Sequence, residues 1–111
     1  MKLTFIELMP FEEYRKEFLS DEEFRLFQNE LMDNPEKGEL IPGLGGLRKV
    51  RIADSLRHKG KRGGARVIYY YYVVKNRIYF VTAYGKNKQT DITNEQKQNL
   101  KFVAERIKAL L

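Results

Sequence analysis

The stretch from Ala65 to Tyr84 constrains the fold more than any other part of the chain. Its first ten residues, ARVIYYYYVV, are mostly β-branched or aromatic, and RIYFVTAY follows after a turn at Asn76. Residues of these types favour strands, and Asn is common in the tight turns of hairpins. The stretch therefore predicts two long strands paired as a β-hairpin.

The first third of the chain carries the signals of one strand and two helices. Residues 2–8 mix apolar and polar positions, which predicts a strand ending at Pro10. Apolar residues then recur at helical spacing from Phe11 to Leu19. The residues Ser20 to Glu23 have the pattern of a capping box, which predicts a second helix that ends at the Asn34-Pro35 pair.

Two further elements flank the hairpin. Residues 36–46 are rich in glycine and proline and predict a loop, and Leu47–Ala53 then alternates in polarity. In that alternation Lys49 and Arg51 share one face, which predicts a half-buried strand with a positively charged open face. Thr93 to Gln96 is a second capping-box candidate, and it predicts an amphipathic helix reaching Leu111.

The predicted order is β-α-α-β-β-β-α in a single domain over residues 1–111. The helical hairpin and the strands must bury their apolar faces on each other, which gives an α+β, two-layer domain with an antiparallel-rich sheet. An antiparallel sheet covered on one side leaves its other face to water or to a ligand.

The charge of the chain is unevenly distributed. Residues 1–39 hold 11 acids and 5 bases, and the other 72 residues hold 4 acids and 16 bases. Eight Lys or Arg residues lie between Arg48 and Arg66, beside tyrosines. Basic side chains bind phosphates and aromatic rings stack on unpaired bases, so single-stranded RNA is the partner this pattern favours. A merely solvated basic face stays open as an alternative.

Several classes of function are disfavoured. The chain has no Cys and a single His, His58, so a zinc site is not expected, and the basic part lacks the clustered carboxylates of two-metal nucleases. We expect no cofactor and no metal. No apolar run has the length of a membrane span, and the absence of Cys fits a cytoplasmic protein. RNA cleavage by this chain would depend on Lys, Arg and Tyr, with the 2′-OH attacking its own phosphate.

Three motifs, GLGGLRKVR (residues 43–51), GKRGGARVIYY (60–70) and YGKN (84–87), resemble the HigB branch of the RelE-like toxins of bacterial toxin–antitoxin modules. The resemblance covers essentially the whole chain. It implies a RelE-like microbial RNase fold and a metal-independent endoribonuclease that cuts mRNA in the ribosomal A site. It also implies a HigA-type antitoxin that keeps the toxin inactive and through which the complex binds its operator DNA.

The resemblance also implies roles for single residues. Arg66 matches the arginine that holds the scissile phosphate, Tyr84 is placed to stack on a base, and Lys86 to protonate the leaving 5′-oxygen. The positions implied to bind RNA or the ribosome are Arg48, Lys49, Arg51, Lys59, Lys61, Arg62, Tyr70 and Asn87. Asn87 stands where the best-known RelE pattern has a second arginine, and the late tyrosine of that pattern has no counterpart.

Two other functions use the same features. A non-catalytic RNA-binding or ribosome-binding module would need only the basic face. A ParE-like toxin acting on a protein target would share the fold without needing Arg66, Tyr84 and Lys86 together. Fold alone does not separate the three.

Overall fold

The computed structural model describes residues 2–52, 64–85, 88–89 and 91–111. Its five-stranded sheet has the order β1-β5-β4-β3-β2, with β1 parallel to β5 and the other pairs antiparallel. The elements are β1 (Thr4–Glu7), α1 (Met9–Phe18), α2 (Asp21–Asp33), β2 (Glu39–Leu40), β3 (Leu47–Ile52), β4 (Ala65–Tyr72), β5 (Arg77–Gly85) and α3 (Asn94–Ala109). The α+β class and the expected order are confirmed, with the two-residue strand β2 in addition.

The predicted hairpin is the centre of the sheet. Strands β4 and β5 pair from Ala65↔Gly85 to Tyr72↔Arg77, with one irregularity between Ile68 and Tyr69. A short 3₁₀ turn, Val73–Lys75, connects them, and Asn76 ends it in the left-handed conformation with φ 51°. Asn tolerates that conformation better than most residues, which explains its place in the turn.

Both capping boxes form as predicted. The hydroxyl of Ser20 accepts from the Glu23 amide at 3.0 Å, and the Glu23 carboxylate accepts from the Ser20 amide at 3.0 Å. Thr93 and Gln96 make the same reciprocal pair at the start of α3. The first strand ends earlier than predicted, at Glu7, and Pro10 lies in the first turn of α1. Proline is tolerated there because the first amides of a helix have no partner within it.

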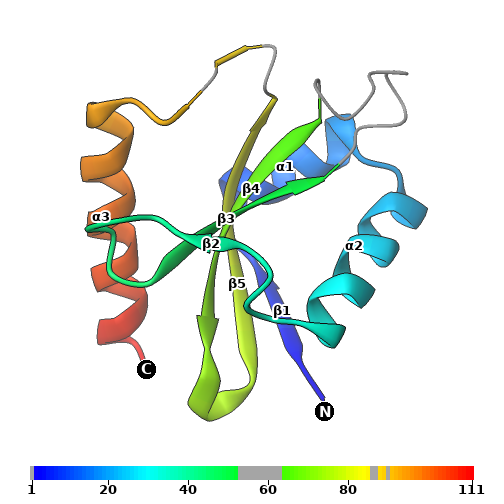
Figure 1. Ribbon diagram of the computed structural model, residues 1–111, viewed down its shortest axis with the longest axis horizontal. Helices are drawn as coiled ribbons and strands as arrows, with labels where there is room; N and C mark the ends of the chain where they lie inside the picture. The colour runs from blue at the N-terminus through cyan, green and yellow to red at the C-terminus, as the bar shows by residue number, and fades with distance from the viewer. Residues whose placement is uncertain (1, 53–63, 86–87, 90) are drawn as a thin grey trace.

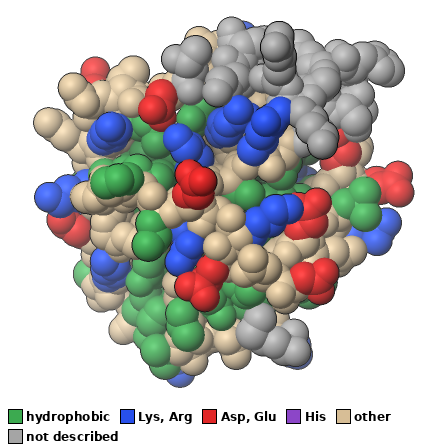
Figure 2. Space-filling view, viewed as in Figure 1, with side chains coloured by type: hydrophobic (Ala, Val, Ile, Leu, Met, Phe, Trp, Pro, Cys, Tyr) green, Lys and Arg blue, Asp and Glu red, His purple; other side chains and the backbone are tan. Residues whose placement is uncertain are grey.

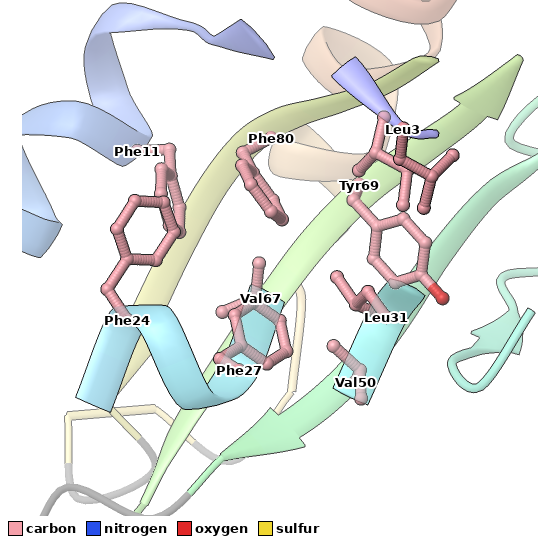
Figure 3. Packing of buried hydrophobic residues seen from close by; sticks show 10 residues of the cluster. Leu3, Phe11, Phe24, Phe27, Leu31, Val50, Val67, Tyr69 and Phe80 are labelled. Carbon is pink, nitrogen blue, oxygen red and sulfur yellow. The ribbon is translucent and has the colours of Figure 1, made fainter. Parts of the chain in front are cut away.

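Each face of the sheet has its own apolar core. Helices α1 and α2 cover one face, where Phe11, Phe24 and Phe27 pack around Phe80 (Figure 3). Helix α3 lies on the opposite side of the sheet (Figure 1), and its buried residues Leu100, Ala104 and Ile107 belong to the second core. We expected this face to be open, but α3 covers part of it, because the apolar side of α3 packs on the sheet. The face is open only where α3 does not cover it.

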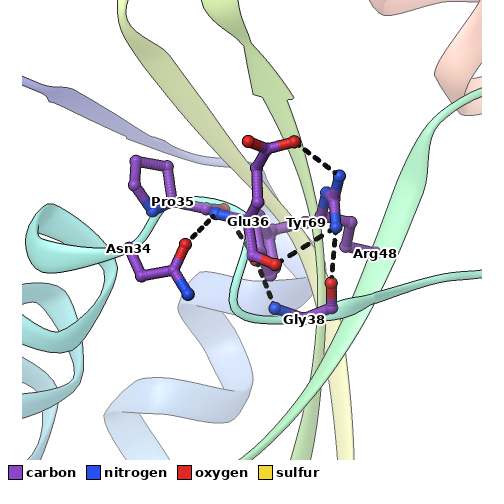
Figure 4. Close-up of polar contacts among 6 residues, drawn as sticks. All are labelled: Asn34, Pro35, Glu36, Gly38, Arg48 and Tyr69. Carbon is purple, nitrogen blue, oxygen red and sulfur yellow. Dashed lines mark hydrogen bonds and ion pairs between the residues drawn. The ribbon is translucent and has the colours of Figure 1, made fainter.

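A polar cluster fixes the segment after α2 to the sheet (Figure 4). The buried Tyr69 hydroxyl donates to the Pro35 carbonyl at 2.8 Å and accepts from the Gly38 amide at 2.9 Å. The Arg48 guanidinium donates to the Gly38 carbonyl at 2.7 Å and to the Glu36 carboxylate at 3.0 Å. A Cβ atom at Gly38 would lie 2.8 Å from the Tyr69 ring, so this close approach requires glycine. This arrangement is called the Arg48 cluster below.

Among the described residues, no helix combines the length and the apolar character needed to cross a membrane.

Candidate functional site

Three side chains form a row across neighbouring strands at one end of the sheet. Arg51 of β3 is the pairing partner of Arg66 of β4, and Arg66 is in turn the partner of Tyr84 of β5. Side chains of directly paired residues lie on the same face, with Cβ atoms about 4.5–5.5 Å apart. Residues distant in sequence thus meet in one line, which is called the Arg51–Arg66–Tyr84 row below.

The row is electrostatically unfavourable for the fold. Like charges placed directly opposite each other in a sheet destabilise it. Burial lowers the pKa of Arg66 from its ordinary value, Arg51 lowers it further, and Tyr84 opposes the shift. An arginine stays charged all the same. Charges held together at such a cost are typical of binding and catalytic sites.

Lys49 extends the positive charge along β3 and is two residues from Arg51 on the same face. Its Nζ atom lies 3.3 Å from the Asp91 Oδ1 atom, and Asp91 belongs to the segment that leads into α3. Lys49 and Arg51 thus share a face, as their alternation predicted, and Lys49 pairs with a carboxylate.

A cavity of about 330 Å³ opens beside the row. Its lining holds four cations and one carboxylate, together with Val50: Lys37, Glu39, Lys49, Val50, Arg51 and Arg66. Figure 2 shows Lys and Arg side chains gathered on the surface next to the residues drawn in grey. A cavity with this excess of positive charge suits a phosphate group.

Tyr84 is half-buried, and its hydroxyl oxygen is buried without a hydrogen-bond partner among the described residues. Burial raises the pKa of the phenol above its ordinary value, the Asp91 carboxylate adds to the rise, and Arg66 opposes it. The phenol is therefore neutral at physiological pH. A neutral phenol with a buried oxygen is a poor base, so the ring is the part of Tyr84 that we expect to serve a ligand.

Two predicted RNA-binding residues lie elsewhere. Arg48 alternates with Lys49 and so lies on the opposite face, where the Arg48 cluster occupies its guanidinium. Tyr70 shares a face with Arg66 but packs in the second core, with Lys108 of α3 over its ring at 5.8 Å. Neither residue adjoins the row, and their binding of RNA stays an untested prediction.

Five other predicted residues, Lys59, Lys61, Arg62, Lys86 and Asn87, lie outside the described residues, as does His58. Two charged cavity residues and the partner of Lys49 were not predicted as site residues: Lys37, Glu39 and Asp91. The position of Asp91 two residues before the capping Thr93 was the available signal, since that cap places Asp91 at the start of α3. Within the part of the chain that the structure describes, no three His, Cys, Asp or Glu side chains gather as a metal site would require.

Comparison with known proteins shows the family of the chain. A family model described as the RelE toxin of the RelE/RelB toxin–antitoxin system matches residues 9–111. Escherichia coli RelE, solved in the free state as a mutant with two arginines replaced by alanine, is 16% identical at a TM-score of 0.52. That alignment covers 81% of this chain and 90% of RelE.

The intact Escherichia coli RelBE toxin–antitoxin complex is also similar. It matches with 17% identity and a TM-score of 0.52, covering 74% of this chain and 94% of the other. At such identities the two structures show the fold alone. The family model shows the family, because it matches nearly the whole sequence. The chain belongs to the RelE toxin family of toxin–antitoxin systems.

Proposed function

We propose that this chain is a ribosome-dependent endoribonuclease, which cleaves mRNA in the ribosomal A site and thereby inhibits translation. The observation that carries the proposal is the position of Arg66 between Arg51 and Tyr84, beside a cavity lined by four cations. The proposal also rests on membership of the RelE toxin family.

The row suits cleavage that uses the RNA's own 2′-hydroxyl. Water takes the proton of the 2′-hydroxyl, the 2′-oxygen attacks the adjacent phosphorus, the bond to the 5′-oxygen breaks, and a 2′,3′-cyclic phosphate remains. Negative charge accumulates on the phosphate oxygens in the transition state, and fixed cations stabilise it there. In the proposed mechanism Arg66 and Arg51 hold these oxygens. The ring of Tyr84 supports the adjoining base by stacking.

Two parts of the proposal rest on the sequence resemblance. Lys86, which follows β5 after Gly85, is proposed to protonate the leaving 5′-oxygen. The second part is that the chain is of the HigB branch of the family, a proposal supported by the motifs at residues 43–51, 60–70 and 84–87. A HigA-type antitoxin is then the proposed partner that neutralises the toxin and carries the complex to operator DNA.

Primer extension on mRNA from cells that express the chain tests the proposal. We expect cuts at defined codon positions that disappear when translation is blocked and when Arg66 is replaced by alanine. Arg25→Ala is the matched control, because Arg25 is an exposed arginine of α2 whose ion pair with Glu22 is 3.8 Å long. Cuts should persist in that variant.

The other outcomes identify the competing functions. Growth arrest without any cuts, retained by Arg66→Ala, would indicate a ParE-like toxin with a protein target. Ribosome association without cuts or growth arrest would indicate a non-catalytic RNA-binding module. Either result would contradict the endoribonuclease proposal.

A further inference from the structure

Asp91 is held in place by the segment that precedes α3. Its Oδ1 atom accepts from the Ile92 amide at 2.7 Å, and its carbonyl accepts from the Gln89 side chain at 2.9 Å. Ile92 is buried in the second core, and the capping box of Thr93 fixes the next residue. These contacts fix the backbone of Asp91, and with it a carboxylate that reaches across to the Lys49 Nζ atom of β3.

The contact between Asp91 and Lys49 contributes little to the stability of the fold. The Asp91 side chain is 65% exposed and that of Lys49 is 31% exposed. Ion pairs with this exposure are weak because water solvates and screens both charges. A carboxylate that contacts a cation while the Ile92 amide also binds it, with little gain in stability, calls for another explanation.

An RNA phosphate, the ligand proposed for the cavity beside the Arg51–Arg66–Tyr84 row, supplies that explanation. A carboxylate and a phosphate both present anionic oxygens to an ammonium group, so each competes with the other for Lys49. Glu39 is the cross-strand partner of Lys49 in β2 and also lines the cavity, but among the described acids it is Asp91 whose oxygen lies within ion-pair distance of Nζ. Asp91 itself does not line the cavity, but its carboxylate binds Lys49, a cation that does.

We propose that Asp91 is a specificity-determining residue that competes with RNA phosphate for Lys49. Its carboxylate lowers the affinity of the chain for any isolated single strand. Stable binding then depends on contacts that displace it, such as those an RNA makes when it is held on a larger surface. This inference rests on the proposed function, because it takes the cavity to be a phosphate site.

The test is the affinity for a single-stranded hexanucleotide whose 2′-oxygens are methylated, so that it cannot be cleaved. Asp91→Asn removes the charge and keeps an oxygen that can accept from the Ile92 amide. We expect this variant to bind about threefold to tenfold more tightly than the parent chain, since an exposed ion pair is lost and Lys49 is released. The slope of log affinity against log salt should steepen by about 0.7, the value for one further phosphate contact in a single strand.

Two variants separate competition from a simple change in net charge. Asp33→Asn alters the net charge equally, at an exposed residue of α2 that does not line the cavity, and should change the affinity less than twofold. In a Lys49→Met background, Asp91→Asn should also have an effect of less than twofold, because the contested cation is gone. Unchanged or weaker binding by Asp91→Asn in the parent chain would overturn the inference.

Arg66→Ala shows which of the two proposals has failed. If that variant binds the hexanucleotide more weakly but Asp91→Asn does not bind more tightly, the cavity holds phosphate and only the competition is wrong. If Arg66→Ala binds as well as the parent chain, the phosphate site itself is wrong, and the proposed function falls with the inference.

Discussion

Two arginines of the central sheet, Arg48 and Arg66, have opposite surroundings. Arg48 is surrounded by acceptors: the carbonyls of Glu36 and Gly38 at 3.2 and 2.7 Å, and the Glu36 carboxylate at 3.0 Å. The described residues offer Arg66 one long contact, to the Gly64 carbonyl at 3.4 Å, and place Arg51 directly opposite. The fold thus gives the Arg48 guanidinium hydrogen-bond acceptors, whereas it places the Arg66 guanidinium opposite another cation.

The difference indicates how a basic domain divides its charges between structure and binding. A guanidinium whose donors already have acceptors holds a loop and has little left for a ligand. A guanidinium with few acceptors beside a second cation favours an anion from outside. Proximity in sequence does not indicate whether a cation serves structure or binding, since Arg48 and Lys49 are neighbours in β3 and belong to opposite faces.

The largest expected effect is on cleavage. Arg66→Ala should lower the rate of ribosome-dependent mRNA cleavage by about 10²–10³-fold, the usual cost of removing one fixed donor to a developing oxyanion. Its free energy of unfolding should stay within about 0.5 kcal/mol of the parent value. A cleavage assay on purified ribosomes and a urea titration measure the two quantities. A loss of less than tenfold would remove Arg66 from the site.

Arg48→Ala should show the reverse pattern. We expect its free energy of unfolding to fall by about 1–3 kcal/mol, because the carbonyl of the buried Gly38 loses its charged donor. The cleavage rate per folded molecule should be unchanged. A urea titration followed by circular dichroism measures stability, and Arg66→Ala serves as the control. Equal stability of the two variants would contradict the distinction between them.

A smaller effect contrasts two tyrosines. Tyr69→Phe should lower the free energy of unfolding by about 1–2 kcal/mol, since the Pro35 carbonyl and the Gly38 amide both lose their partner. Tyr84→Phe should leave stability equal or slightly higher, because the buried hydroxyl has no partner among the described residues. Because the proposed role of Tyr84 is stacking, Tyr84→Phe should also keep most of the cleavage activity. An activity as low as that of Tyr84→Ala would show that the hydroxyl takes part in the reaction.

The smallest effect is on pH dependence. Burial raises the pKa of both Tyr69 and Tyr84 above their ordinary values. The folded state therefore disfavours the phenolate, and stability is retained below the unfolded pKa of about 10 and decreases as pH rises beyond it. Urea titrations between pH 8 and 11 should show a shallower loss for Tyr84→Phe than for the parent chain. Parallel curves would indicate that Tyr84 titrates as an exposed tyrosine does.

Local patterns in the sequence were enough to predict the hairpin, both capping boxes and the shared face of Lys49 and Arg51. These features depend on residues close in sequence or on simple alternation. The position of α3 and the Lys49–Asp91 contact were not predicted, because they join residues far apart along the chain. Strand β2 has only two residues and pairs through its backbone, so composition gave no signal for it. The functional roles of Lys59, Lys61, Arg62, Lys86 and Asn87 stay predictions.

The parallel pairing of β1 with β5 has a consequence for synthesis. Thr4 pairs with Arg77, so the first strand has no partner in the sheet until most of the chain has been translated. Contacts between such distant segments form late because a long loop must close first. Tyr84 belongs to the same late strand. An incomplete chain that ends before β5 therefore has neither a finished sheet nor the complete row.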